Sequence, residues 1–339
     1  MTSPPYSRRM RLGLIAAARI TDRAIAQPAR DLDDVTLAVV GARDVQRAQV
    51  AADEWGVERA VGSYEEVIAS DDIDAIYIAT PNAHHRQWAI ESLRAGKHVL
   101  CEKPLAANAA EAREMVAVAE ETGLILMEAF HWRYHPLVAQ IQAMVDAGMI
   151  GEIEGADAAF DLADGRIPLT DIRWDYSIAG GSLMDLGCYP VQWLRWLLGP
   201  TPTVVSASAV CPVELVDGRI DAELQWPDGR VATLSSSMIE PDGRNDIRLS
   251  IYGSDGTMIV ANPLAPQMGS SITLEQNGQR AVYEVDSSAS YFHQLIAFRD
   301  AVSSGTPPIT SGDDSIQTME VVDAIYTTAG IGPRQALPH

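Results

Sequence analysis

The chain has 339 residues, of which 47% are hydrophobic and 21% charged, a composition typical of a soluble protein with room for two cores. A formal net charge of −21 argues against a nucleic-acid partner, because phosphate binding relies on clustered Lys and Arg. The three cysteines form no Cys-x-x-Cys pair and no even disulfide framework, and no apolar stretch approaches the ~18–20 residues of a membrane span. We therefore expect a cytoplasmic protein.

Arg8 and Arg9, followed by an apolar run, resemble the start of a twin-arginine export signal. The run ends at Arg19 after about seven residues, which is at the short limit for the core of such a signal. Cleavage behind it would also remove residues 11–17, which have the pattern of a first strand. We therefore expect this segment to belong to the fold.

Strand and helix patterns alternate from the N-terminus to about residue 128. The strand patterns cover residues 11–17, 35–40, 73–79, 98–101 and 124–128. Helical patterns lie between them: from Arg19, from Asp44 to Gly56, after a Ser-x-x-Glu capping box at Ser63, from Asn82 to Gly96, and over 108–122. Strands that alternate with helices of about 10–15 residues predict a parallel sheet with crossover helices. We predict a doubly wound, dinucleotide-binding Rossmann domain over residues 1–128.

The second half of the chain has a different pattern. After a helix near 136–147 come short strand patterns, several of them separated by Asp-Gly turns, at 204–210, 221–225, 231–237, 247–252, 258–260 and 271–275. Helical stretches at 291–303 and after Gly312 finish the chain. We predict an α+β domain over residues 129–339 with a large, mostly antiparallel sheet, and ligands in the crevice where the parallel strands of the first domain end.

The loop after the first strand should carry the glycines that bind a dinucleotide. The three glycine positions are instead occupied by Ala16, Ala18 and Thr21. Alanine is the smallest substitute, but it costs free energy where φ must be positive. The position of the loop between a strand and a helix still makes it the predicted phosphate site, with contacts from Ala16, Ala18, Arg19 and Ile20.

The end of the second strand predicts which dinucleotide binds. The position of the acidic residue that bonds the adenosine ribose is held by Ala42, and Arg43 follows it. Loss of the carboxylate removes repulsion toward a 2′-phosphate, and a guanidinium supplies a planar partner for it. The alternative is that Arg43 is a solvated residue ahead of a capping Asp44. We expect NADP, with NAD possible.

Only two of the 25 basic residues are lysines, Lys97 and Lys103. Arg stays protonated at any working pH, whereas Lys is a compact donor whose pKa moves readily. Lys97 follows the helix stop Gly96 and has the position of a helix-end charge. The alternative is that the preference for Arg reflects codon composition alone. Lys103, which precedes a proline at the end of an apolar strand, fits that alternative less well than Lys97.

Polar residues follow three predicted strands at their carboxyl ends, in residues 79–85, 102–104 and 128–136. Because these ends converge in a parallel sheet, the three segments together predict a ligand site. In a fourth segment, residues 180–190, Asp185 and Tyr189 are four positions apart and share one face of a helix. Taken alone, this pair is equally well explained as a cap and a packed aromatic residue.

These motifs resemble those of the glucose–fructose oxidoreductase, inositol dehydrogenase and MocA (Gfo/Idh/MocA) family of NAD(P)-dependent oxidoreductases. The resemblance runs through residues 77–85, 96–104, 128–136 and 180–190 and a Tyr291-x-x-Gln294-x-x-x-Phe298 helix. Tyr at position 189, where inositol-type members have His, resembles the branch that holds glucose–fructose oxidoreductase, aldose 1-dehydrogenases and dimeric dihydrodiol dehydrogenase.

The resemblance implies a role for each matching residue. It makes Lys103 and Tyr189 the catalytic pair, with Asp185 placing or polarising the substrate. It also implies that the nicotinamide end of the cofactor is lined by Asn82, His85, Glu102, Trp132 and Arg133, and we expect Thr80, Pro81 and Lys103 to bind the cofactor as well. No metal is expected.

The chemistry of these residues fits an alcohol oxidation. A hydroxyl proton must leave as hydride moves to the nicotinamide, and the phenol of Tyr189, with an unperturbed pKa of about 10, needs help to act as a base near neutrality. A nearby Lys103 ammonium favours the phenolate and is expected to lower that pKa. We predict hydride transfer at a hydroxyl or carbonyl carbon of an aldose or polyol.

Alternatives stay open at this stage. One alternative is that the substrate is a cyclic vicinal diol. The other is that the chain is a cofactor-sensing regulator without catalysis, and the intact Lys103, Asp185 and Tyr189 argue against this second alternative. The segment 163–176 is expected to set specificity, with Arg173, Trp174 and Tyr176 contacting substrate or packing the domains. Because the antiparallel sheet lacks enough helices to cover both faces, and the family pairs this sheet between subunits, we expect a homodimer or homotetramer.

Overall fold

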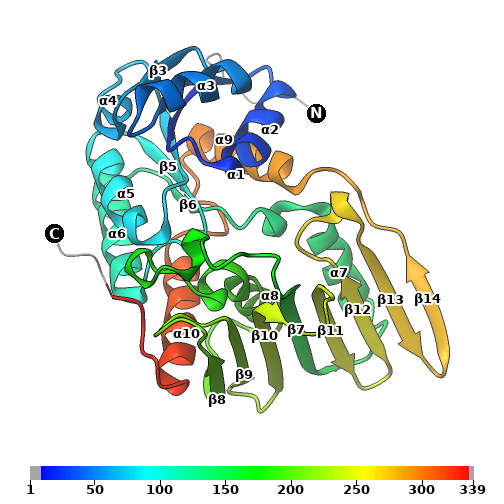
Figure 1. The fold of residues 1–339 in the computed structure, drawn as a ribbon. Coiled ribbons are helices and arrows are strands. Elements are labelled where there is room, and N and C mark those ends of the chain that lie inside the picture. Colours follow the sequence, from blue (N-terminus) through cyan, green and yellow to red (C-terminus); the bar gives the residue numbers. More distant parts are fainter. Residues whose placement is uncertain (1–8, 336–339) are drawn as a thin grey trace.

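The computed structural model describes residues 9–335, so Arg8 of the arginine pair lies outside the described residues. The chain forms two β-sheets, each flanked by helices (Figure 1). No helix within residues 9–335 is both long and apolar enough to cross a membrane.

The first sheet has six strands in the order β3-β2-β1-β4-β5-β6, and all its pairings are parallel. Its strands are β1 (Met10–Ile15), β2 (Val35–Gly41), β3 (Arg59–Val61), β4 (Ala75–Ile78), β5 (His98–Cys101) and β6 (Leu126–Glu128). Apolar runs such as β4 are buried throughout, because helices cover both faces of a parallel sheet. The doubly wound prediction is confirmed, and only the short β3 was missed.

Side-chain caps begin three of the helices in this half. They are α1 (Arg19–Thr21), which a π-helical turn continues into α2 (Gln27–Arg30), then α3 (Val45–Trp55), α4 (Tyr64–Ile68), α5 (His85–Arg94) and α6 (Ala109–Thr122). The side chains of Asp44, Ser63 and Asn108 accept hydrogen bonds from backbone N–H groups at the starts of α3, α4 and α6. Gly56 ends α3 in the left-handed conformation, with φ 75°.

The second sheet has eight strands in the order β14-β13-β12-β11-β7-β10-β9-β8. They are β7 (Ile153–Ala163), β8 (Thr203–Val210), β9 (Arg219–Gln225), β10 (Val231–Glu240), β11 (Asp246–Gly253), β12 (Thr257–Ala261), β13 (Ser271–Gln276) and β14 (Gln279–Tyr283). Only the β7–β10 pair is parallel, so the mostly antiparallel sheet is confirmed. The central strand β7 was not predicted, because it is rich in alanine and poor in the β-branched residues that mark strands.

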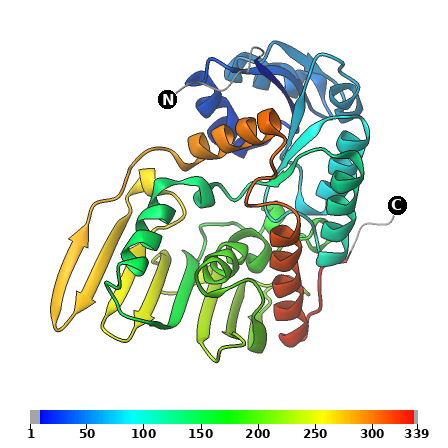
Figure 2. The same cartoon turned by 180° about the vertical axis from the view of Figure 1, so that it is seen from behind.

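Helices cover one face of this sheet. They are α7 (Pro136–Asp146), α8 (Cys188–Leu198) and α10 (Asp313–Thr328), and Figure 2 shows them in front of the strands when the molecule is viewed from behind. Helix α8 packs on β7 and β10, and α10 packs on β8, on α8 and on α6 of the first half. The opposite face of the sheet carries polar and charged side chains.

Helix α9 (Ser290–Ser304) comes from the second half of the chain but packs on the first domain, beside α2 (Figures 1 and 2). Its Tyr291, Leu295 and Phe298 are buried in the same apolar cluster as Leu14 of β1. At its outer side, Arg299 Nη1 lies 2.9 Å from Asp34 Oδ2. The Rossmann core therefore includes a helix that lies beyond residue 128 in the sequence.

Candidate active site

The loops after β4 and β5 meet at the carboxyl edge of the first sheet. The ring nitrogens of His85 lie 2.9 Å from the carbonyl oxygen of Thr80 and 3.0 Å from that of Pro104, so this buried side chain joins the two loops. Tyr77 donates its hydroxyl proton to Glu102 Oε1 over 2.7 Å. These contacts fix the backbone on either side of Lys103.

Lys103 lies against Asp185, which comes from the second half of the chain. Its Nζ donates to the backbone oxygen of Asp185 at 2.6 Å and to Oδ1 at 3.2 Å. The other carboxylate oxygen accepts from Arg173 Nε at 2.5 Å. Although burial opposes ionisation, the two cations hold the pKa of Asp185 below its usual value, and Asp185 in turn raises the pKa of Lys103. The structure therefore holds a carboxylate between an ammonium and a guanidinium.

Tyr189 lies directly beside this charged group. Lys103 Nζ is 5.0 Å from the centre of the Tyr189 ring, above its face, and Phe130 packs edge-on against the same ring. Burial raises the pKa of Tyr189 well above its usual value. Burial therefore outweighs the lowering of this pKa that was expected from Lys103, because the ammonium binds Asp185 and lies over the ring face, not at the phenolic oxygen.

The hydroxyl of Tyr189 contacts His131, which no sequence argument assigned. The Tyr189 oxygen lies 3.3 Å from His131 Nε2, and His131 Nδ1 lies 2.8 Å from Ser290 Oγ at the start of α9. The only sequence signal was that His131 lies in the polar segment after β6.

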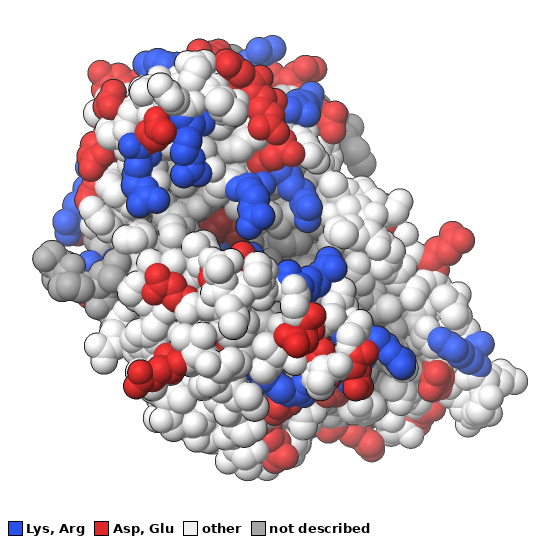
Figure 3. All heavy atoms as spheres, viewed as in Figure 1, with Lys and Arg blue, Asp and Glu red and all other residues white. Residues whose placement is uncertain are grey.

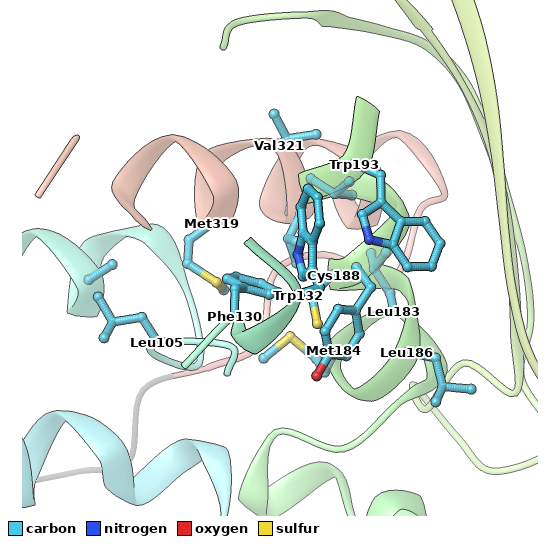
Figure 4. Packing of buried hydrophobic residues seen from close by; sticks show 14 of the residues in the cluster. Leu105, Phe130, Trp132, Leu183, Met184, Leu186, Cys188, Trp193, Met319 and Val321 are labelled. Carbon is cyan, nitrogen blue, oxygen red and sulfur yellow. The ribbon is translucent and has the colours of Figure 1, made fainter. Parts of the chain in front are cut away.

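The remaining predicted nicotinamide residues occupy different surroundings. Asn82 Nδ2 donates to the carbonyl oxygen of Ala179 at 3.1 Å and so ties the loop after β4 to the second half. Trp132 is 2% exposed and lies edge-on to Trp193 and Trp196, among the buried side chains of Figure 4. The Arg133 guanidinium carbon stands 5.4 Å from the centre of the Trp132 ring.

The three residues predicted to contact substrate have different surroundings. Arg173 contacts Asp185 and, through Nη1, Asp171 Oδ1 at 3.0 Å. Trp174 is buried and donates from Nε1 to the carbonyl oxygen of Ile167 at 3.3 Å. Tyr176 packs with its ring centre 5.3 Å from the guanidinium carbon of Arg334. Of the three, the structure brings only Arg173 into contact with the Lys103–Asp185 group.

The first loop has the form that a pyrophosphate requires. Ala16 takes φ 79°, the left-handed conformation of a glycine position. Ala18 begins the helical segment without a side-chain cap, which leaves the first N–H groups for an anion.

The side chains near this loop are partly exposed. Arg19 is exposed, with Nη2 3.8 Å from Asp171 Oδ2 of the second half. Ile20 is half-buried, and Ala42 is buried while Arg43 is exposed. Figure 3 shows several Lys and Arg side chains along a hollow between the two halves. A dinucleotide fits these residues.

The left-handed Ala16 leads to a stability prediction. Replacing Ala16→Gly removes the steric cost of the Cβ at positive φ, which outweighs the larger unfolded-state entropy of glycine. We expect the free energy of unfolding to rise by up to about 1 kcal/mol, measured by urea denaturation without cofactor. An Ala18→Gly variant is the matched control, because Ala18 has φ −85° and should lose stability. A loss of stability in Ala16→Gly would contradict the assigned strain.

A buried ion pair anchors the loop that leads into Asp185. Arg334 donates to the carbonyl oxygen of Gly180 at 2.8 Å and to Asp217 Oδ1 at 2.5 Å, and both charged side chains are 0% exposed. Asp217 Oδ2 accepts the backbone N–H of Leu183 at 2.7 Å. Since a broken buried pair costs about 3–5 kcal/mol, this contact holds the Asp185 turn in place. Arg334 lies outside every sequence motif and was not predicted.

A second cluster of titratable groups lies away from this site. The ligand atoms of His135, Asp286 and His293 come within 4.8 Å of one another. Leu137 donates its backbone N–H to His135 Nδ1, so in the neutral ring Nε2 carries the proton, and Nε2 lies 3.1 Å from the carbonyl oxygen of Ser288. His135 thus offers no lone pair toward the other two side chains, and we assign no metal there.

Comparison with known families agrees with this geometry. Residues 10–130 match the oxidoreductase family with an NAD-binding Rossmann fold, Gfo/Idh/MocA, and residues 138–259 match the Gfo/Idh/MocA C-terminal domain. The chain belongs to the Gfo/Idh/MocA family. The resemblance found in the sequence is confirmed, and with it the assignment as an oxidoreductase.

Two curated relatives illustrate the range of the family. D-xylose 1-dehydrogenase (NADP(+)) 2 of Haloferax volcanii is 35% identical over 95% of this chain and 98% of its own length. Trans-1,2-dihydrobenzene-1,2-diol dehydrogenase of Mus musculus is 36% identical over 65% of this chain and 66% of its own length.

A solved structure shows the same architecture. A 3-ketoreductase from Actinomadura kijaniata, in complex with NADP and TDP-benzene, superposes with a TM-score of 0.88 and 28% identity over 95% of this chain and 98% of its own. Both halves of this chain therefore have counterparts in a single enzyme.

Proposed function

We propose that this protein is an NADP-dependent oxidoreductase that transfers hydride between the nicotinamide and a hydroxyl-bearing carbon of an aldose or polyol. The observation that supports the proposal most strongly is the contact of Lys103, Asp185 and Tyr189 at the carboxyl edge of the Rossmann sheet. The full-length similarity to an NADP-linked xylose dehydrogenase favours a sugar among the possible alcohols.

Bound NADP would supply the hydride acceptor, or the donor in the reverse direction. The residues proposed to hold it are the first loop, Arg43 and the loops after β4 and β5. Asp185, which Lys103 and Arg173 keep ionised, accepts a hydrogen bond from a substrate hydroxyl and so orients the substrate. Tyr189 exchanges the proton with the reacting oxygen, and the Lys103 charge stabilises the electron-rich ring as the phenol ionises. In reduction the neutral phenol, which burial favours, is the acid.

We assign Arg43 as the partner of the 2′-phosphate on the adenosine ribose of NADP. This side chain is exposed and follows the buried Ala42, which holds the position where a carboxylate would bond an unphosphorylated ribose. We expect Arg43→Ala to weaken NADP binding by about tenfold or more and to leave NAD binding nearly unchanged, because it removes one charge-assisted hydrogen bond. Fluorescence titration with both cofactors measures this ratio, and Arg47→Ala, which removes an arginine about one helical turn further along, on α3, is the control. An equal loss for both cofactors would argue against the assignment.

A second candidate substrate class is a cyclic trans-diol. The similarity to a trans-1,2-dihydrobenzene-1,2-diol dehydrogenase, 36% identical over 65% of this chain, supports this class. A cofactor-sensing regulator without turnover is disfavoured by the complete Lys103–Asp185–Tyr189 group.

A substrate panel distinguishes these functions. Formation of NADPH at 340 nm is followed with aldoses, polyols and trans-dihydrodiols, each with NADP and with NAD. We expect the highest kcat/KM for an aldose or polyol with NADP. Preference for the diols would support the second candidate, and no turnover on any compound in a protein that binds NADPH would support the regulator.

The proposed assembly is a homodimer or homotetramer formed by the open face of the second sheet. This face carries opposite charges close together: Arg219 lies 2.7 Å from Asp221, and Arg248 pairs with Asp157 at 2.5 Å. A surface with both signs can complement its own copy around a two-fold axis. We expect light scattering to give at least twice the monomer mass and Arg248→Glu to lower it, whereas a monomeric wild-type protein would contradict the proposal.

A further inference from the structure

The hydroxyl of Tyr189 has a partner that the proposed mechanism has not used. Within residues 9–335, its only hydrogen-bond partner is His131, whose Nε2 lies 3.3 Å away. Lys103 cannot take this place, because its Nζ donates to the backbone and side-chain oxygens of Asp185 and stands over the Tyr189 ring. A group other than the lysine therefore governs the phenolic oxygen.

The His131 ring is held rigidly and without charge. It is 2% exposed, and its centre lies 4.0 Å from that of the Tyr291 ring at an interplanar angle of 33°. Burial, aided by Lys103, lowers the pKa of His131 to about 3. A neutral imidazole has one N–H donor and one acceptor, so the hydrogen bond at Nδ1 decides what Nε2 offers to Tyr189.

The hydrogen bond with Ser290 bears on the tautomer of His131. Its Oγ lies 2.8 Å from His131 Nδ1, and Gln267 Oε1, at 3.4 Å from the Ser290 backbone N–H and 3.5 Å from Oγ, is the more distant acceptor. We infer that the Ser290 hydroxyl donates its one proton to Nδ1, the nearer of the two acceptors, so that His131 carries its own proton on Nε2. The Tyr189 oxygen then accepts a hydrogen bond, which leaves the phenolic proton free for the substrate oxygen.

From this geometry, and resting on the proposed role of Tyr189, we infer that His131 is a positioning residue whose Nε2–H stabilises the Tyr189 phenolate. In oxidation, the substrate C–H leaves as hydride to NADP and the hydroxyl proton bonds to the phenolate oxygen, giving a carbonyl, NADPH and a neutral phenol. In reduction the same proton returns. The His131 proton stays on Nε2 throughout, and no further reactant is needed.

Other charged and titratable groups also face the two rings and contribute to any pH profile. Those facing Tyr189 are Lys103, Asp185, Glu102, Cys188 and Tyr291, and those facing His131 are Lys103, His135 and Arg23. None of them forms a hydrogen bond with the phenolic oxygen within the described chain. A variant at His131 therefore changes the one direct contact and leaves this surrounding charge unaltered.

The test uses the full-length protein with NADP and its best alcohol substrate. His131→Phe keeps a ring against Tyr291 but has no N–H, His131→Gln keeps an amide N–H near the place of Nε2, and His293→Gln on α9 is the matched control. In oxidation the phenolate is the active form, so kcat rises with pH through the pKa of Tyr189. Loss of a hydrogen bond to a charged oxygen should move that pKa upward by about 1 to 2 in His131→Phe, so that kcat below it falls about 10- to 100-fold while KM changes little.

His131→Gln should shift the profile less than His131→Phe, and Ser290→Ala should shift it in the same direction as His131→Phe because the tautomer is no longer selected. Urea midpoints and NADPH dissociation constants verify that each variant is folded and binds cofactor. A folded His131→Phe with the wild-type profile, or equal shifts for Phe and Gln, would overturn the inference. Wild-type turnover by Tyr189→Phe would instead refute the proposed function, so the two failures are separate.

Discussion

Replacing Tyr189→Phe is expected to lower turnover by at least ~10²-fold while NADPH binding is retained. The phenolic oxygen is the group proposed to exchange a proton with the substrate, and the ring itself fills a buried space against Phe130 and Phe160. Phenylalanine keeps this packing, so the loss of about 2.7 kcal/mol of transition-state stabilisation would come from the missing proton. The measurement is kcat at saturating aldose, together with an NADPH titration.

Tyr134→Phe is the matched control for this variant. Its hydroxyl lies 2.7 Å from Thr310 Oγ1, away from Lys103 and Asp185, so its removal should leave turnover unchanged within a few-fold. Near-wild-type turnover in Tyr189→Phe would show that the proton passes through another group.

Replacing Lys103→Met should lower turnover to a similar extent, by about 10²-fold or more. The change removes the charge that stands over the Tyr189 ring and one of the two cations that keep Asp185 ionised. The pKa of Asp185 should then rise toward that of an ordinary buried carboxyl group. A protonated Asp185 accepts a weaker hydrogen bond from the substrate, so both substrate orientation and proton transfer should become less efficient. The loss should appear mainly in kcat, with the NADPH dissociation constant changed much less.

The chain offers its only other lysine as the control. Lys97 Nζ donates to the carbonyl oxygen of Ile73 at 2.9 Å, just before β4 and outside the site. Lys97→Met should cost stability without a comparable fall in kcat. Equal losses of kcat in the two lysine variants would mean that a general loss of structure, and not the active-site charge, explains the effect at Lys103.

Periodicity and turn residues predicted most of the fold. The first sheet was predicted because its strands are short apolar runs with helical patterns between them, and Asp44 and Ser63 cap where expected. Strand β7 was missed because alanines carry little strand preference, and its place at the centre of an eight-stranded sheet depends on neighbours distant in sequence. The packing of α9 on the first domain was not predictable either, since an apolar helix face does not specify its partner.

The site was predictable where topology alone brings residues together. Thr80 and Lys103 end neighbouring parallel strands, so they had to lie at one edge. The direction of the Lys103 side chain was not predictable, because it depends on a contact with Asp185, 82 positions away in the sequence. This contact places the ammonium over the face of the Tyr189 ring and not at the Tyr189 hydroxyl. His131 and Arg334 act through single tertiary contacts that leave no pattern in the sequence.

The central claim is that Lys103 and Tyr189 serve one proton transfer, and a double-mutant cycle tests it most directly. The quantity to measure is kcat for NADPH formation in wild type, Lys103→Met, Tyr189→Phe and the double variant, with one aldose at saturation. If the two residues act as a unit, the double variant should be no more than a few-fold slower than the slower single variant. Losses that multiply fully in the double variant would contradict the claim.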